Sequence, residues 1–362
     1  MALNTVSTNR LSTNVKPSNL SSGFGPLGSR NMVINGAMQV NQRGSGSLTV
    51  NSSTGQFPCD RWVARGEGGS KAYTIQQVSI ASSGQGVRNA IKVTSSQAAT
   101  VSSSDIFNVR QMVEGFNVQR MNFGESGCKS MTLSFTVRSS VAGTHSGAIQ
   151  NSAQNRSYPF TYTLSANTWT DISVTIPPIT SGSFNESNGV GARVVFDMGC
   201  GNNFRGTAGQ WNSAQDEGAT GSVRILETNG ATWEVTKVQL EVGTEGTDFE
   251  HRSLGDELTL CQRYHRRIGS FNGVAASTTQ VQAGIEFGQE MRATPSVSLV
   301  PATQARVTDC SHADYQNTGP TIGINNSSSV GLRIFINGFS GMTIQRIAVF
   351  LPSGTNFSVL HL

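Results

Sequence analysis

The residues best suited to contact a ligand lie in the stretch GCGNNFRGTAGQWNSAQDEG within residues 199–221. It shows no strand alternation, so we predict a long loop. An indole can stack on the apolar face of a sugar ring, and amides or a guanidinium can bond its hydroxyls. The candidate glycan-binding residues are Trp211, Asn202, Asn203, Arg205 and Asn212. In the alternative interpretation Trp211 folds back onto the protein and the loop is structural.

Motifs for catalysis are not found in this sequence. It has no G-x-S-x-G nucleophile turn, no H-E-x-x-H zinc helix and no G-K-[ST] phosphate loop. The five histidines have no metal-ligand spacing. Cleavage of a polysaccharide needs two carboxylates on either side of the bond. The acidic pairs at 216–217 and 256–257 have simpler roles, the first in a loop and the second at the start of a helix. We therefore expect a protein that is not an enzyme.

The cysteines are few, scattered and odd in number. They are Cys59, Cys128, Cys200, Cys261 and Cys310, and no two form a C-x-x-C pair. This pattern disfavours a zinc site or a thioredoxin-type site. We expect five free thiols that behave as small hydrophobic residues in a reducing cytoplasm.

Alternation of apolar and polar residues predicts the elements that must carry these side chains. It occurs at 130–138, 172–176 and 192–196, and Pro177-Pro178 ends the second run. Asn229-Gly230, between VRILET and ATWEVTKVQLEV, predicts a type I′ hairpin. Short strands with 40 glycines and few helix formers favour an antiparallel β-sandwich. The strands place Trp62, Trp169 and Trp233 in the core, whereas Tyr158 and Tyr162 are expected to face outward.

One segment, HRSLGDELTLCQRYHRRI at 251–268, predicts a helix between two β regions. Ser253 is a plausible N-cap for it, followed three residues later by Asp256. Basic residues at 263, 266 and 267 would lie near its negative end. After it, residues 269–362 return to strand patterns at Ile285, Val297, Leu332 and IQRIAVFL.

Charge and hydropathy exclude several classes of partner. The net charge of +4 is spread thinly, and charged residues make up 13% of the chain, so we expect no nucleic-acid partner. No apolar stretch is long enough to cross a membrane, and the first residues lack the apolar core of a signal peptide. Residues 1–30 have apolar anchors but no periodicity, which predicts either a disordered tail or an arm that orders on a partner.

The chain also resembles a known family. The strings NMVINGAMQVNQRG, CDRW, NTWTDISVTIPP, GATWEVTKVQLEVG and DFEHRSLGDELTLCQRY occur in that order. They resemble a β-sandwich family in tail fibres and other surface proteins of tailed phages, which looks like a carbohydrate-binding module with a jelly-roll fold. The match covers roughly residues 29–267.

The residue patterns and the resemblance together predict a mainly β protein with four parts. These are an N-terminal docking arm at 1–30, a jelly-roll domain at 31–250, a junction helix at 251–268 and a β-rich C-terminal domain at 269–362. The resemblance also implies a homotrimer in a virion, and the lack of a signal-peptide core predicts assembly in the host cytoplasm. No cofactor is expected; modules of this type often carry structural calcium, for which Asp60, Glu241 and Asp248 are candidate ligands.

The expected function is that of a phage structural protein. The leading interpretation is a tail fibre that adsorbs to a host-surface glycan and docks on other virion proteins through residues 1–30. A head-decorating fibre or knob, or an adaptor protein, remains the alternative, with no dedicated receptor site. The sequence does not decide between tail and head.

Overall fold

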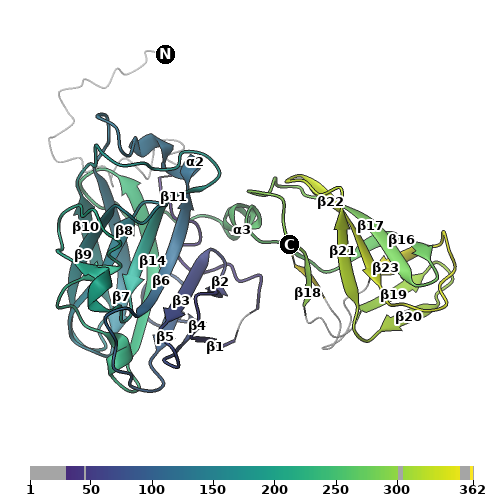
Figure 1. Ribbon diagram of the computed structural model, residues 1–362, viewed down its shortest axis with the longest axis horizontal. Helices are drawn as coiled ribbons and strands as arrows, with labels where there is room; N and C mark the ends of the chain where they lie inside the picture. The colour runs from purple at the N-terminus through teal and green to yellow at the C-terminus, as the bar shows by residue number, and fades with distance from the viewer. Residues whose placement is uncertain (1–29, 45, 301–304, 351–358, 362) are drawn as a thin grey trace, which may run out of the picture. The chain divides into compact units, whose positions relative to one another are not determined.

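The computed structural model describes residues 30–44, 46–300, 305–350 and 359–361. The docking arm expected at residues 1–30 lies outside the described residues except for Arg30. The chain forms two compact units (Figure 1). The first contains residues 46–58 and 62–252 with the segment up to Gln39, and the second contains Val40–Gly44, Cys59–Arg61 and the chain from Ser253 onward.

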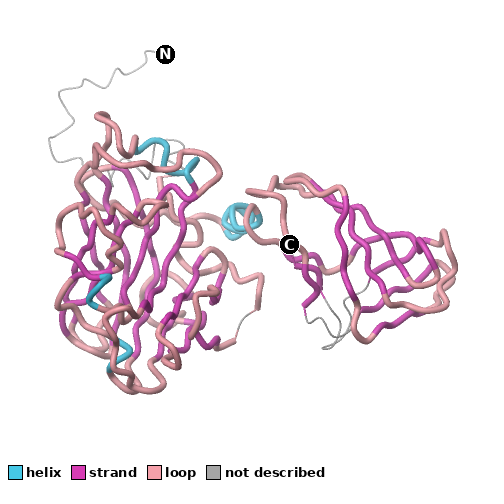
Figure 2. The backbone as a smooth tube through the Cα atoms, in the orientation of Figure 1, coloured by secondary structure: helices cyan, strands magenta, loops and turns pink. Residues whose placement is uncertain are grey.

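The first unit is a sandwich of two six-stranded sheets, which confirms the predicted mainly β jelly-roll fold. Sheet A has the order β1 (Leu48–Val50), β4 (Tyr73–Ser79), β5 (Asn89–Thr94), β14 (Thr232–Val242), β7 (Met131–Ser139) and β10 (Thr170–Ile176). Sheet B has the order β2 (Gln56–Cys59), β3 (Trp62–Glu67), β6 (Ile106–Glu114), β11 (Val190–Asp197), β8 (Gly143–Gln150) and β9 (Ser157–Leu164). Strands dominate the regular structure (Figure 2).

The core of the sandwich is aromatic. Phe196 of sheet B packs against Phe135 and Trp233 of sheet A, with ring centroids 5.0 and 5.2 Å apart. Trp62 and Trp233 are fully buried, as predicted from their place in strand patterns. Trp169 differs: it precedes β10 and is half-buried. The predicted alternation at 130–138, 172–176 and 192–196 corresponds to β7, β10 and β11, because each strand turns its apolar residues toward the opposite sheet.

Two local predictions for this unit are wrong. Tyr158 and Tyr162 face inward and are almost fully buried, and the Tyr162 hydroxyl accepts a hydrogen bond from Trp233 Nε1 (3.1 Å). The hairpin at Asn229-Gly230 does not form, because the segment before it is the 3₁₀ helix η4 (Ile225–Glu227). Its backbone bonds to other loops instead: Leu226 N donates to Met198 O and Leu226 O accepts from Ala99 N.

Short elements complete the first unit. They are α2 (Gly115–Val118), η2 (Gln119–Met121), η3 (Asn202–Phe204) and the parallel pair β12 (Arg205–Gly206) and β13 (Gly218–Ala219). Three of them, η3, β12 and β13, lie within the stretch 199–221 that the sequence predicted as a loop.

The second unit begins with the predicted helix. The helix α3 spans Leu254–Gln262, and Ser253 is its N-cap, with its hydroxyl accepting a hydrogen bond from Asp256 N (3.1 Å). The helix is shorter than predicted, so the basic residues expected at its end lie beyond it. Tyr264 N and His265 N both turn back to Cys261 O, which closes the helix there.

The rest of the second unit is β-rich, as predicted. A seven-stranded sheet has the order β20 (Asp314–Asn317), β19 (Ala305–Asp309), β23 (Ile347–Phe350), β16 (Phe271–Ser277), β17 (Gln280–Glu286), β22 (Gly331–Asn337) and β21 (Thr321–Asn325). A three-stranded sheet contains β15 (Arg267–Ile268), β24 (Val359–His361) and β18 (Ser298–Val300). Phe350, Ile334 and Val281 lie in a shared buried core. Among the described residues, no helix has the length and hydropathy needed to span a membrane.

Candidate functional site

The outer face of sheet A is polar across three strands. Because side chains alternate along a strand, the residues opposite the core of β7, β10 and β14 all face the same side. The strand register aligns them in rows, such as Asp171, Thr136 and Thr236, followed by Ser173, Ser134 and Gln239. On this face, called the polar face below, Asp171 and Ser173 are exposed and Ser134 is half-buried, whereas Thr136, Thr236 and Gln239 are buried.

An irregularity in β14 adds a lysine to the polar face. Between the pairs Thr236–Thr136 and Gln239–Ser134, Lys237 and Val238 of β14 lie opposite Phe135 alone. Lys237 has a φ of 51°, as expected at a bulge, where one residue leaves the regular pleat. Its ammonium group lies 3.5 Å from Asp171 Oδ1.

A hollow of about 280 Å³ lies beside this ion pair. The Asp171 side chain is 78% exposed, and its Oδ1 also accepts a hydrogen bond from Thr136 Oγ1 (2.5 Å). Phe249, which is half-buried, contributes an aromatic ring to the lining. The hollow is lined by Ser134, Phe135, Thr136, Asp171, Ile172, Ser173, Lys237, Gly246, Thr247, Asp248 and Phe249.

The loop 243–250 forms one wall of the hollow. Thr132 Oγ1 donates to Gly243 O (3.0 Å) and Thr175 Oγ1 donates to Thr244 O (2.7 Å), so the loop is fixed to β7 and β10. Glu241 accepts hydrogen bonds from both the backbone N and the Oγ1 of Thr247. Several hydrogen bonds therefore hold the wall in place, so the loop loses little conformational entropy when a ligand binds against it.

A charged row continues the polar face on the other side of Thr136. Glu234 lies between Arg138 (2.7 Å) and Lys92 (3.8 Å), and its side chain is only 5% exposed. The guanidinium carbon of Arg138 lies 4.9 Å from the centre of the Trp169 ring. This cation–π contact fixes the position of Trp169, which is half-buried next to the polar face.

The polar face can bind a ligand that carries many hydroxyls. A carboxylate accepts hydrogen bonds, an ammonium donates them, and threonine and serine do both. Phe249 adds the apolar area that the less polar face of a sugar ring needs. Convergent polar groups around a hollow with an aromatic wall are typical of small-ligand sites.

Trp211, predicted as the centre of a glycan site, is in contact with other aromatic residues. Its indole Nε1 donates to Pro177 O (2.9 Å), and its ring lies 5.5 Å from that of Tyr158 and 6.5 Å from that of Phe184. Phe184 in turn stacks on Phe123 at 4.6 Å. The ring of Trp211 is half-buried, an arrangement that favours the interpretation of a tryptophan folded back onto the sandwich.

The proposed polar partners of Trp211 do not converge on it. The prediction for Arg205 is corrected by the structure. Its side chain is 2% exposed and pairs with the buried Asp197 (2.7 Å), so it is unable to reach a surface ligand. Asn202 and Asn203 are exposed, and Asn202 Oδ1 accepts from Arg224 Nη2 (2.6 Å). Asn212 donates from Nδ2 to Asp216 (2.7 Å), and its backbone pairs with Ser157.

The three candidate calcium ligands are not arranged as a metal site. Asp60 belongs to the second unit, whereas Glu241 and Asp248 belong to the first. Asp60 pairs with Arg43 at 3.0 Å, and Glu241 is used by the Thr247 contacts. Within the described ranges, no group of three or more His, Cys, Asp or Glu side chains is placed to hold a metal ion.

Sequence reasoning missed the polar face, although it contained two signals for it. The polar residues of MTLSFTVR and TDISVTI alternate in step, which places them on one face. In TWEVTKVQLEV the valines Val235 and Val238 are three residues apart, which breaks the alternation and indicates a bulge at Lys237. Which strands lie next to each other was not readable from the sequence.

Comparisons with known proteins give weak similarities. No family model and no curated protein matches the chain. One similar solved structure is the enzymatically active domain of tailspike protein 4 from bacteriophage CBA120. The two chains are 11% identical over an alignment that covers 59% of this chain and 22% of the tailspike chain, with a TM-score of 0.32.

Two carbohydrate-binding modules are also similar. A family 11 module from Clostridium thermocellum is 13% identical, with 56% of this chain and 98% of its own covered, at a TM-score of 0.27. A family 16 module is 12% identical, with 58% and 99% covered, at a TM-score of 0.28.

Proposed function

We propose that this protein is a structural component of a tailed-phage particle, a tail fibre that adsorbs to a host-surface glycan through the polar face of sheet A. The observation that carries the glycan-binding part is the hollow lined by exposed Asp171, half-buried Lys237, several hydroxyl side chains and Phe249. The arrangement matches the alternating apolar and hydroxyl surfaces of a sugar.

The proposal for the particle rests on the sequence. The strings from NMVINGAMQVNQRG to DFEHRSLGDELTLCQRY resemble phage appendage proteins, and the low charge and high glycine content fit an extracellular β-rich surface. In this proposal the protein is non-enzymatic and trimeric, and residues 1–30 dock it on another virion protein. Three copies of a weak glycan site on one trimer raise the avidity strongly.

The glycan-binding part is tested with Asp171→Asn and Thr136→Val. Asp171→Asn removes a charge-assisted acceptor, and Thr136→Val removes the hydroxyl that positions it. Both should reduce binding to a glycan array and to host cells by about tenfold each, while melting temperature changes little. Glu245→Gln is the matched control, because Glu245 is exposed on the same loop and does not line the hollow. Unchanged binding in both variants contradicts the proposal.

The alternative of a head-decorating fibre, knob or adaptor is tested on particles. Antibody labelling seen by electron microscopy should mark tails for a tail fibre and capsids for a decorating protein. A chain without residues 2–28 should stay folded and trimeric but be absent from particles. If the truncated chain is incorporated normally, the docking role of the arm is wrong.

A further inference from the structure

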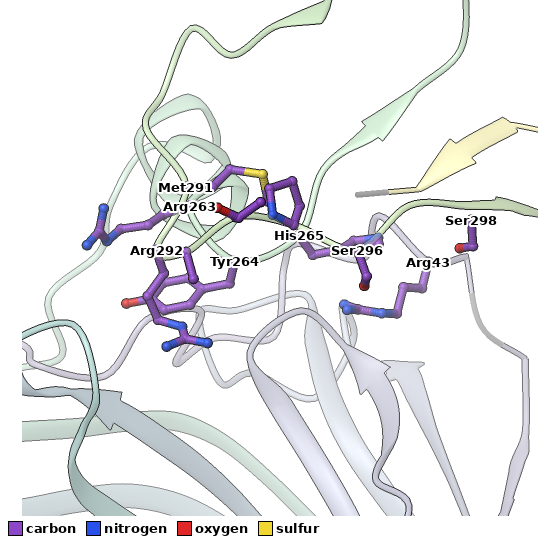
Figure 3. A pocket seen from close by; sticks show the side chains of 11 residues that line it. Arg43, Arg263, Tyr264, His265, Met291, Arg292, Ser296 and Ser298 are labelled. Atoms are coloured by element: carbon purple, nitrogen blue, oxygen red, sulfur yellow. The ribbon is translucent and has the colours of Figure 1, made fainter. Parts of the chain in front are cut away.

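The second unit contains a pocket of about 430 Å³ that the glycan proposal does not use. Figure 3 shows its side chains, which come from the chain after α3, from the segment 291–298 and from Arg43. Its described lining residues are Arg43, Arg263, Tyr264, His265, Met291, Arg292, Ala293, Thr294, Pro295, Ser296 and Ser298. A volume of this size is within the range of small-molecule sites.

The charged side chains among the described lining residues of the pocket are all basic. Three arginines and a histidine line it, and none of the described lining residues is acidic. Asp60, which does not line the pocket, pairs with Arg43 at 3.0 Å and is 1% exposed. Burial lowers the pKa of Arg43, and Asp60 opposes this effect. A partly desolvated guanidinium attracts an anion more strongly than one in bulk water.

Backbone bonds hold the cationic residues in place. Arg292 N donates to Arg263 O (2.8 Å), which ties the segment 291–298 to the chain after α3. Gln42 N donates to Asp60 Oδ2 (2.8 Å) and Gln42 Nε2 donates to His265 O (2.7 Å), which links Asp60 to the pocket wall. The site is therefore formed before a ligand arrives.

The pocket also offers neutral donors. Thr294, Ser296 and Ser298 contribute hydroxyls, and all three residues are exposed. In Figure 3 the side chains of Arg43 and Ser296 project into the same part of the view, whereas the guanidinium of Arg263 points away from them. The guanidinium carbon of Arg61 lies 3.4 Å from the centre of the Tyr264 ring, and this cation–π contact holds the ring in place.

We propose that this pocket binds an oxyanion, a phosphate or sulfate carried free or on a sugar. Guanidinium groups bind such groups with two parallel hydrogen bonds, and serine and threonine hydroxyls complete the donor set. The inference does not depend on the polar face of sheet A, since the two sites belong to different units and share no residue.

The test measures binding of inorganic phosphate to the full chain by calorimetry, at constant ionic strength set with chloride. Arg292→Gln should weaken phosphate binding about tenfold by removing a guanidinium partner. Ser296→Asp places a carboxylate in the pocket and should abolish binding. Arg292 and Ser296 are exposed, so both variants should fold. Arg267→Gln is the control, because it removes an exposed arginine of the same unit that does not line the pocket.

Glucose 6-phosphate and glucose distinguish the sources of the anion. Tighter binding of glucose 6-phosphate than of inorganic phosphate identifies a sugar-borne anion, and equal binding identifies the free ion; glucose should not bind. The proposal is overturned if wild-type protein does not bind phosphate, or if Arg267→Gln weakens binding as much as Arg292→Gln.

Discussion

The ammonium group of Lys237 lies 3.5 Å from Asp171 Oδ1 because β14 contains one residue more than β7 at this point. In a regular strand, residue 237 would point to the core side, since its neighbour Thr236 faces outward. The bulge changes this and places both charges beside the hollow of the polar face. A backbone irregularity thus brings an ammonium group and a carboxylate together at the candidate site.

The first prediction concerns the backbone at Lys237. Its φ of 51° is costly for any residue except glycine, so Lys237→Gly should leave stability unchanged or raise it by up to about 1 kcal/mol. Glycan binding should fall, because the ammonium is lost. Lys92→Gly is the matched control within a regular strand of the same sheet, and it should cost about 1 kcal/mol. Denaturant unfolding checks both, and a marked loss of stability in Lys237→Gly contradicts the prediction.

The second prediction concerns Trp211. Because its ring contacts Tyr158 and Phe184 and its Nε1 bonds to Pro177, Trp211→Ala should destabilise the first unit by about 2 kcal/mol, roughly half the cost at a fully buried site. Trp211→Phe should cost less, since it keeps ring contacts. Thermal unfolding measures both. An unchanged melting temperature combined with reduced adsorption to host cells would instead support the glycan role of this loop.

The third prediction concerns thiol reactivity. Burial raises the pKa of the Cys59, Cys200 and Cys261 thiols, so the reactive thiolate is scarce at pH 8. In folded protein, exposed Cys310 should react quickly with a disulfide reagent and half-buried Cys128 slowly.

Denaturation in the absence of reductant should release five thiols in total. Cys310→Ser is the control and should remove the fast phase alone. A count of three or one after denaturation would show disulfide bridges and contradict the expectation of free thiols.

The fourth prediction concerns assembly. Leu254 and Leu260 of α3 are 60% and 37% exposed, so the part of the chain that the structure describes leaves apolar area of this helix uncovered. Light scattering should give three times the chain mass of 38.4 kDa. Leu254→Ser should weaken the trimer, whereas Thr259→Ala on the same helix should not. A monomer mass across micromolar dilution contradicts the trimer.

Local patterns in the sequence determined much of the fold. Alternation predicted β7, β10 and β11, and the chemistry of Ser253 predicted the start of α3, because these features depend on residues close together in the chain. The predicted end of this helix was wrong, because nothing in the local sequence distinguishes Arg263 from a helical residue. The helix ends where Tyr264 N and His265 N donate to Cys261 O.

Tertiary structure decided the candidate sites. The sequence places Arg205 in a polar loop, but in the structure its pairing with Asp197 buries it, and that contact joins β12 to the end of β11. The same holds for the candidate site of Asp171, Thr136 and Lys237. These residues lie together because β10, β7 and β14, which are far apart in sequence, pair in one register. Alternation tells which residues share a face of one strand, whereas strand order and register depend on packing of the whole sandwich.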